Sequence, residues 1–319
     1  MKRRDLNIAT LALLSNFSST AWAQDRYPSR SLKVIVPYPA GGVVDVQTRA
    51  MTQGLATELG QAVVVESRPG ANGNIAAEAV ARASADGYTL LVTAPYFINN
   101  PMLETSMRWA QKDFVPVARF SMSPSFMCVP AASSARTVRE YVELARRTKP
   151  ALQYGDPGAG TTQTMTVEIL KSVAGIEIEP ITYKGAPPIA VDLITNTLSM
   201  SVLPSSVAFP HVKSGKLRAL AITSSARSAQ LPDVPTIAEA GYPEATVISW
   251  YGLHAPANTA IADLRKLDAA IKASVQKSET QTRLVSAGGE EAYLSMDEFS
   301  RFIAADTQMW ERINKMLRK

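Results

Sequence analysis

The residues best suited to chemistry in this chain form a glycine-containing turn, Pro37–Asp45, with the sequence Pro-Tyr-Pro-Ala-Gly-Gly-Val-Val-Asp. The turn follows the apolar run Leu32–Val36 and precedes a helical pattern. A helix that begins there leaves backbone N–H groups without partners, and these donors, together with the helix dipole, favour an anion. Glycine also lets a ligand approach the backbone closely. The turn therefore predicts half of an anion-binding cleft; the alternative is an ordinary turn whose donors are capped by Asp45 or by water.

A second glycine cluster, Tyr154–Gln163, also lies between a predicted strand and a predicted helix. Backbone donors at Gly158–Thr162 and the hydroxyls of Thr161 and Thr162 could hold a carboxylate. The cluster is not a P-loop, because no Gly-Lys-Ser/Thr follows, and it does not match Gly-x-Gly-x-x-Gly. The alternative is that Thr161 or Thr162 serves only as the helix N-cap, although a cap and a ligand site can coexist.

A third turn of the same kind is Tyr183–Pro188, which carries Lys184 beside Gly185. Lys184 could face the cleft as a charge partner for an anion. A lone lysine is more often a solvated surface residue, and the sequence favours that interpretation.

Sequence motifs for catalysis or metal binding are absent. The chain has no Gly-x-Ser-x-Gly, no His-Glu-x-x-His and no Cys-x-x-Cys. Its two histidines, His211 and His254, are far apart in the sequence, which argues against a zinc site. We therefore predict no metal, no cofactor and no enzymatic activity, and the several turns suited to anions favour binding over turnover.

The elements that must position these turns are apolar runs alternating with helical patterns, which is typical of an α/β fold with parallel strands covered on both faces. The predicted strands are Leu32–Val36, Val63–Val65, Tyr88–Thr93, Phe126–Val129, Leu152–Gly155, Glu179–Tyr183, Ser199–Leu203, Leu217–Thr223 and Trp250–His254. The predicted helices between them include Asp45–Leu59, Ile75–Ala83, Val138–Arg147, Thr164–Val173 and Pro187–Ile194. Residues 113–125 look irregular and are interpreted as the passage to a second unit. The C-terminal part is predicted to be helical and to pack back on the first unit.

The N-terminus has the pattern of a secretory signal peptide. Basic residues Lys2–Arg4 precede the short apolar stretch Ile8–Leu14, and Ala21–Ala23 is a small-x-small cleavage site. We predict cleavage after Ala23 and export of the mature chain. The single Cys128 cannot form an internal disulfide, which suits a chain of 319 residues that is large enough to be stabilised by its core.

The charge balance is mildly basic, with a formal net charge of +5. This balance fits an anionic ligand. Lys and Arg are scattered, without a basic helix or an aromatic-basic stripe, so nucleic acid is not a predicted partner. No stretch of the predicted mature chain approaches the roughly 20 apolar residues of a membrane span.

Taken together and in order, eight stretches of the sequence resemble the solute-binding proteins of the tripartite tricarboxylate transporter family, of the Bordetella uptake gene (Bug) type. The stretches are Pro37–Gly42 with Asp45, Glu66–Ala71 with Gly73, Ala85–Leu91, Tyr183–Gly185, Gly215–Ala221, Val234–Gly241, Trp250–Leu253 and Ala255–Pro256. The resemblance covers essentially the whole predicted mature chain.

The resemblance implies a periplasmic binding protein of the type II-like, Venus flytrap architecture, with two lobes that each contain a mostly parallel sheet flanked by helices. Residues 24–124 and 251–319 would form a discontinuous first domain and residues 125–250 the second. A monomer would capture a small organic acid and deliver it to the membrane components of a tripartite tricarboxylate transporter. The implied ligand-binding residues are Tyr38, Ala40, Gly41, Gly42, Asp45, Thr93, Ala94, Pro95, Gly158, Ala159, Gly160, Thr161, Thr162, Gln163, Lys184, Gly185 and Ser205.

The chain departs from the family pattern at Thr164, where the family commonly has a histidine, a change that could alter the choice of ligand. It also has Asn196 and Ser199 where Gly and Asp are frequent. Two other functions stay open at this point. The protein could be a ligand-dependent partner of a membrane signalling receptor, or a secreted enzyme of unknown chemistry.

Overall fold

The computed structural model of the chain describes residues 27–104, 106–158, 161–183 and 185–317. The predicted signal peptide therefore lies outside the described residues, as do Ala159, Gly160 and Lys184. Across the described ranges, no helix combines the length and the apolar character that crossing a membrane requires.

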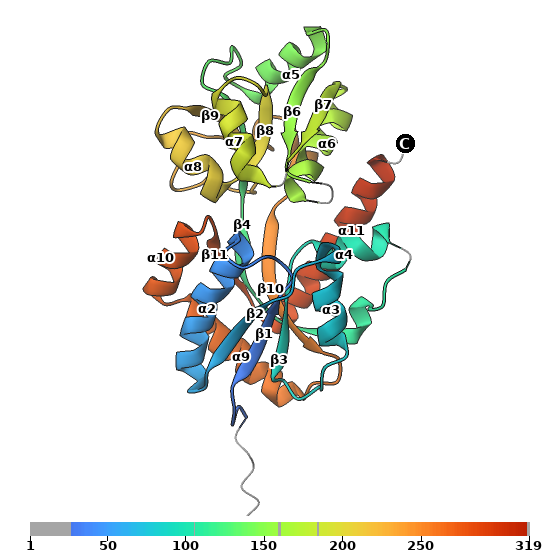
Figure 1. Cartoon of the computed structure of the whole chain (residues 1–319), viewed down its shortest axis with the longest axis vertical. Helices are drawn as coiled ribbons and strands as arrows, with labels where there is room; N and C mark the ends of the chain where they lie inside the picture. The colour runs from blue at the N-terminus through green and yellow to red at the C-terminus, as the bar shows by residue number, and fades with distance from the viewer. Residues whose placement is uncertain (1–26, 105, 159–160, 184, 318–319) are drawn as a thin grey trace, which may run out of the picture.

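Two β-sheets organise the chain into two lobes, stacked along the long axis of the molecule in Figure 1. The first lobe holds a six-stranded sheet in the order β11-β4-β10-β3-β1-β2, and the second lobe a five-stranded sheet in the order β7-β6-β8-β5-β9. The strands of the first sheet are β1 (Leu32–Val36), β2 (Val63–Ser67), β3 (Thr89–Thr93), β4 (Phe114–Ser123), β10 (Ser249–Pro256) and β11 (Glu290–Leu294). Those of the second are β5 (Ser125–Pro130), β6 (Leu152–Asp156), β7 (Ile178–Thr182), β8 (Met200–Pro204) and β9 (Leu217–Ile222).

Helices flank both sheets, which confirms the predicted two-lobed α/β architecture (Figure 1). The α-helices of the first lobe are α2 (Val43–Leu59), α3 (Asn74–Ala81), α4 (Tyr96–Leu103), α9 (Ile261–Val275), α10 (Ser278–Ser286) and α11 (Met296–Leu317). The second lobe holds α5 (Val138–Arg147), α6 (Thr162–Ala174), α7 (Ala186–Ile194) and α8 (Ser205–Lys213). Short 3-10 turns occur at η1 (Ala71–Gly73), η2 (Gln111–Asp113) and η3 (Pro243–Ala245).

Most strands of each sheet run in one direction, as predicted. In the first sheet β1 pairs in parallel with β2 and β3, whereas β10 is antiparallel to both of its neighbours, β3 and β4. The second sheet follows the same plan, with parallel pairs among β6, β7 and β8 and an antiparallel β5 between β8 and β9. Each sheet is thus a set of strands that run in one direction, interrupted by an antiparallel strand next to the crossing between lobes; the first sheet also ends in the antiparallel edge strand β11.

The prediction that residues 113–125 are irregular was wrong. Residues 114–123 form β4, a ten-residue strand that continues through Pro124 into β5 of the other lobe. The hydroxyl of Ser121 donates to Gln47 Oε1 at 2.7 Å and that of Ser123 to the carbonyl of Gly288 at 2.9 Å. In the sequence, these serines argue against a buried strand, because a buried hydroxyl needs a hydrogen-bond partner. The two bonds supply those partners.

The long helix α11 packs on the first lobe, as expected of the C-terminal part, but it also contacts α6 of the second lobe. Its buried Phe299 ring lies against the backbone of Gly252 in β10. The indole N–H of Trp250, also in β10, donates to the Asp306 carboxylate at 2.8 Å. The helix therefore braces the strand that links the two lobes.

Asp306 makes the stability of this brace depend on pH. Burial raises the pKa of its carboxyl from 3.8 to about 6, and the Trp250 bond and the charge of Arg119 offset this only in part. The folded-state pKa lies above that of the unfolded chain, so the associated stability is fully present below pH 3.8 and is lost as the pH rises through 6. The shift corresponds to at most about 3 kcal/mol.

We therefore expect Asp306→Asn, which keeps an acceptor for Trp250 and removes the charge, to raise the melting temperature at pH 8 but not at pH 4. Thermal denaturation at both pH values measures the difference. Glu311→Gln, a change at an exposed carboxyl on the same helix, is the matched control. If Asp306→Asn is no more stable than the wild type at pH 8, burial of the charged Asp306 carboxylate does not destabilise the protein, and the argument is contradicted.

Candidate functional site

A cavity of about 200 Å³ lies between the two lobes and is called the interlobe cleft here. Both lobes contribute to its walls, and β10, which links them, supplies two lining residues. The lining residues are Tyr38, Val44, Asn72, Ala94, Pro95, Tyr96, Thr161, Thr162, Gln163, Pro204, Ser249 and Tyr251.

The strand-to-helix junctions of both sheets meet at this cleft. Tyr38 and Val44 come from the β1–α2 junction and Ala94–Tyr96 from the β3–α4 junction. From the second lobe, Thr161–Gln163 belong to the start of α6 and Pro204 directly precedes α8. Ligands of α/β proteins bind at the carboxyl ends of parallel strands, where helices begin. Four helix N-termini, with their positive dipole ends, therefore border one cavity.

The start of α6 presents backbone donors to the cleft. Thr161 is the N-cap, and its hydroxyl accepts a hydrogen bond from the Thr164 N–H at 3.2 Å. The N–H groups of Thr162 and Gln163 have no acceptor among the described residues. Among the described residues, a capped donor and two donors without an acceptor thus occur together at the start of α6, and the latter two suit an anion.

The start of α2 differs from the expectation at Gly41. The N–H of Gly41, whose φ is +78°, donates to the Asp45 carboxylate at 2.9 Å, so capping by Asp45 applies to this donor. The N–H groups of Val43 and Val44, the first two residues of the helix, have no acceptor within the described part of the chain. The N–H of Asp45, the third residue, likewise has no acceptor among the described residues, so any donors that α2 offers an anion are those of residues 43–45 rather than that of Gly41.

Asp45 orders this turn instead of lining the cleft. Its buried carboxylate also accepts hydrogen bonds from Arg49 Nε at 2.9 Å and from the Ser67 hydroxyl at 3.2 Å. Burial alone would raise the pKa of Asp45, but the bonds from Arg49, Gly41 and Ser67 outweigh it and hold the pKa below its ordinary value. The carboxylate is thus ionised and fully engaged within the protein.

The predicted site residues divide into those that line the cleft and those that do not. Lining residues are Tyr38, Ala94, Pro95, Thr161, Thr162 and Gln163. Ala40, Gly41 and Gly42 lie in the turn before α2, and Gly185 is the N-cap of α7; none of these four lines the cleft. Ala159, Gly160 and Lys184 fall outside the described residues.

Three further predicted residues face other parts of the molecule. The fully buried Thr93 hydroxyl lies 2.8 Å from His254 Nδ1, and burial lowers the pKa of His254 to about 3, so this pair is a neutral core contact. Gly158 donates its N–H to Asp156 at 2.9 Å. Ser205 lines a neighbouring groove, and its hydroxyl donates to the Pro124 carbonyl at 2.7 Å. None of these three residues is among the lining residues of the interlobe cleft.

Sequence reasoning missed half of the lining. The missed residues are Val44, Asn72, Tyr96, Pro204, Ser249 and Tyr251. Tyr251 lies within Trp250–Leu253, a stretch that carries the family resemblance, so a signal was present for it, whereas Asn72 lies between two matching segments and is not part of either. Burial raises the pKa of Tyr251 to about 12, which keeps its hydroxyl a neutral donor.

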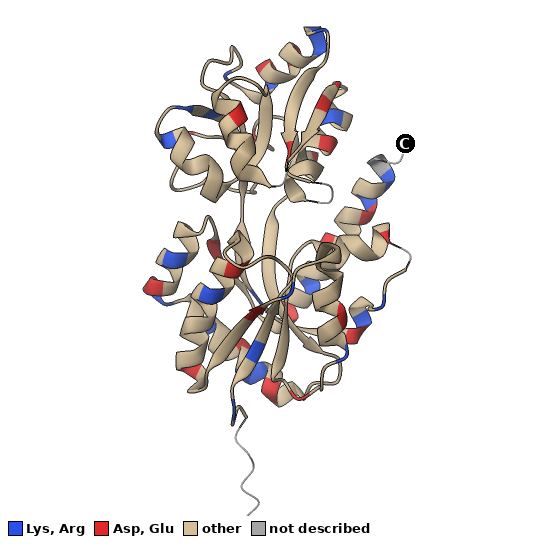
Figure 2. Cartoon of the chain, viewed as in Figure 1, with Lys and Arg blue, Asp and Glu red and all other residues tan. Residues whose placement is uncertain are grey.

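All twelve lining residues are uncharged. Figure 2 shows lysine, arginine and the acidic residues distributed mainly over the outer faces of both lobes. An anion in the cleft would therefore be held by backbone amides, helix dipoles and neutral hydroxyl and amide groups, unless a residue outside the described ranges also reaches it.

Thr164, the position at which the sequence was expected to depart from the family pattern, stabilises the loop before α6. Its hydroxyl is buried and contacts the Gly158 carbonyl and the Thr161 hydroxyl, each at 2.8 Å, as well as the Asp156 carboxylate. The residue holds the loop in shape and is not among the cleft-lining residues.

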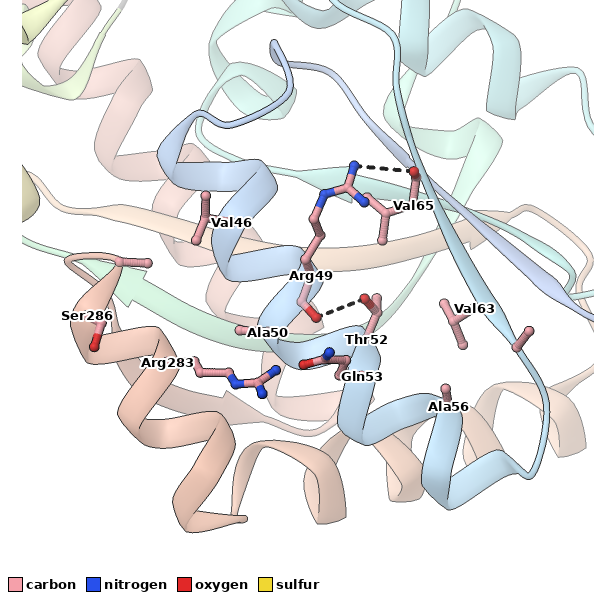
Figure 3. Close-up of a pocket in the computed structure, with 12 residues that line it drawn as sticks. Val46, Arg49, Ala50, Thr52, Gln53, Ala56, Val63, Val65, Arg283 and Ser286 are labelled. Atoms are coloured by element: carbon pink, nitrogen blue, oxygen red, sulfur yellow. Dashed lines mark hydrogen bonds between the residues drawn. The ribbon is translucent and has the colours of Figure 1, made fainter.

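A larger hollow, of about 770 Å³, lies on the first lobe alone, between α2, β2 and α10 (Figure 3). Arg49 extends across it toward the Val65 carbonyl. None of the predicted site residues lines this hollow, and it lacks the converging helix starts. We therefore place the candidate site in the smaller interlobe cleft.

Comparison with known proteins gives a consistent family match. A family model described as "Tripartite tricarboxylate transporter family receptor" matches residues 47–318. The protein BugT of Bordetella pertussis is 31% identical over 308 residues, which cover 94% of this chain and 94% of BugT.

Solved structures agree with this match. An R. palustris protein solved with adipate is 29% identical, with a TM-score of 0.80 and coverage of 91% of this chain and 98% of that one. MatC from Rhodopseudomonas palustris, solved with bound malate, is 26% identical, with a TM-score of 0.75 and coverage of 90% and 99%. Both resembling structures contain a dicarboxylate.

Proposed function

The chain belongs to the tripartite tricarboxylate transporter family of receptors, and on this premise we propose that it captures a small carboxylate in the interlobe cleft and delivers it to the membrane components of such a transporter. The adipate and malate in the two related structures support a carboxylate ligand. The observation that carries the proposal is the pair of amides at the start of α6, those of Thr162 and Gln163, which have no acceptor among the described residues. They belong to a cavity whose described lining is uncharged and which three more helix starts border.

The proposed mechanism is binding without a covalent step. The Thr162 and Gln163 amides of the second lobe hold the carboxylate from one side, and the start of α2 stabilises it from the other. Hinge closure around the ligand excludes water and thereby strengthens these hydrogen bonds. The phenol of Tyr251, neutral because burial raises its pKa to about 12, supplies a further donor from the linking strand. Nothing in this scheme requires turnover of the ligand.

We further propose that the protein acts in the periplasm as a monomer after removal of residues 1–23. The basic start, the apolar stretch and the Ala21–Ala23 site support export. The lobes are proposed to correspond to residues 24–124 with 251–319 and to residues 125–250. Strand membership supports these bounds closely, since β4 ends at Ser123 and β10 begins at Ser249.

A ligand screen on protein stripped of bound molecules tests this function. We expect at least one of adipate, malate, citrate, an acidic amino acid or an aromatic acid to raise the melting temperature, because a ligand present at about 100 times its Kd adds about 2.7 kcal/mol of stability. The corresponding neutral amides are the control and should have no effect. Absence of a shift with every acid in the panel would contradict the proposal.

A further inference from the structure

Outside the cleft, the two lobes touch at a point where there is no room for a side chain. A Cβ atom placed on Gly288, in the turn between α10 and β11 of the first lobe, would lie 2.5 Å from the backbone N of Ser206 and 2.9 Å from its Cα. Ser206 is the second residue of α8 in the second lobe. Ordinary contact begins at 3.4 Å, so the two backbones approach as closely as they do only because residue 288 is glycine.

The first-lobe side of this contact is firmly held. The Gly288 carbonyl accepts a hydrogen bond from Ser123 at the end of β4, at 2.9 Å. The neighbouring Ala287 carbonyl accepts one from Gln47 Nε2 at 3.3 Å, and Gln47 in turn accepts one from Ser121 at 2.7 Å. The turn is therefore fixed to β4 and α2 and cannot easily move aside.

The second-lobe side is fixed to the crossing between lobes and leads directly to the cleft. Ser205, the first residue of α8, donates to the Pro124 carbonyl through its N–H at 3.2 Å and its hydroxyl at 2.7 Å. Pro204, the preceding residue, lines the interlobe cleft. A displacement of the start of α8 is thus transmitted through two residues to the cleft wall.

A groove of about 660 Å³ lies beside the contact and is lined by residues of both lobes. On this side of the molecule, the space next to the contact is therefore open and does not hold the lobes together. We propose that Gly288 is a positioning residue that sets how closely the two lobes approach. A side chain at this position would act as a wedge against α8 and would disfavour the conformation in which the cleft is enclosed. The prediction about ligand affinity rests on the proposed function, whereas the prediction about lobe spacing does not.

Gly288→Ala tests whether a side chain at this position pushes α8 away from the first lobe, and Gly215→Ala is the matched control. The two glycines have similar φ values, +72° and +69°, so alanine brings comparable backbone strain, but a Cβ on Gly215 would have no neighbour within 4 Å. Spin labels on cysteines introduced at the exposed residues Ser214 and Glu279 report the distance between α8 and α10. The native Cys128 is fully buried and does not interfere with labelling.

Without ligand, Gly288→Ala is expected to lengthen the label-to-label distance by about 1 Å or more, since a 2.5 Å contact has to relax toward 3.4 Å, and Gly215→Ala to leave it unchanged. With the acid that gives the largest shift in the screen, Gly288→Ala should lose about tenfold in affinity relative to Gly215→Ala. An unchanged label distance, or an affinity equal to that of the control, overturns the inference. If no acid binds even the wild type, the proposed function fails, while the distance measurement still decides the role of Gly288.

Discussion

Replacing Thr162 with proline is expected to weaken carboxylate binding by roughly 10- to 100-fold while helix α6 stays intact. Thr162 is the first residue of α6, a position where proline is well tolerated because its missing N–H has no partner within the helix. The preceding Thr161 has an extended backbone, with ψ of 151°, which suits a residue before proline. The change removes one charge-assisted hydrogen bond, worth about 1.5–3 kcal/mol.

The threonine side chain has its own contact, so a second variant is needed. The Thr162 hydroxyl lies 2.7 Å from the Ser249 hydroxyl, and proline removes this contact as well. Thr162→Val removes the hydroxyl but keeps the N–H, and the difference between the two variants isolates the amide. Titration calorimetry measures the affinities, and far-UV circular dichroism checks the fold. Equal affinities of Thr162→Pro and Thr162→Val for the ligand would show that the Thr162 amide does not bind it.

Gly252→Ala is expected to destabilise the protein by about 3 kcal/mol, at the upper end of the cost of overpacking a core. A Cβ at this position would lie 2.2 Å from Phe299 Cζ and 3.0 Å from the Ala118 carbonyl oxygen. Phe299 is fully buried, so its ring has no free space to enter. The clash would separate α11 from the strand that links the lobes.

A double-mutant cycle in urea denaturation tests this reasoning. Phe299→Ala alone should cost about 3–5 kcal/mol through the cavity that it leaves. In Gly252→Ala combined with Phe299→Ala, the new methyl group occupies part of that cavity. The double variant should therefore be more stable than the sum of the single effects predicts. Strict additivity would mean that the ring and the glycine do not constrain each other.

Elements with a complete local signal were predictable from the sequence. The helix predicted at Val138–Arg147 forms with the same bounds, because Thr137 caps it and accepts a hydrogen bond from the Glu140 N–H at 3.1 Å. Strand β4 was not predictable, since its serines are satisfied by Gln47 and Gly288, which are distant in the sequence. The local pattern carries no information about such partners.

The same limit applies to the cleft. The sequence located the helix starts, because strand, glycine turn and helical pattern follow one another within a few residues. It did not determine which way each side chain faces, and Thr93 turned out to point toward His254 in the core. Ser249 and Tyr251 were missed because they reach the cleft through the pairing of β10 with β3 and β4, which lie more than a hundred residues earlier in the chain.

The placement of β10 has a consequence for the order in which the two lobes can fold. β10 lies between β3 and β4, so the sheet of the first lobe stays divided until residues 249–256 have been added to the chain. All five strands of the second lobe are complete by residue 222. The lobe that is encoded in the middle of the sequence can therefore assemble before the lobe that contains β1, β2 and β3, which reverses the usual N-to-C order of domain folding.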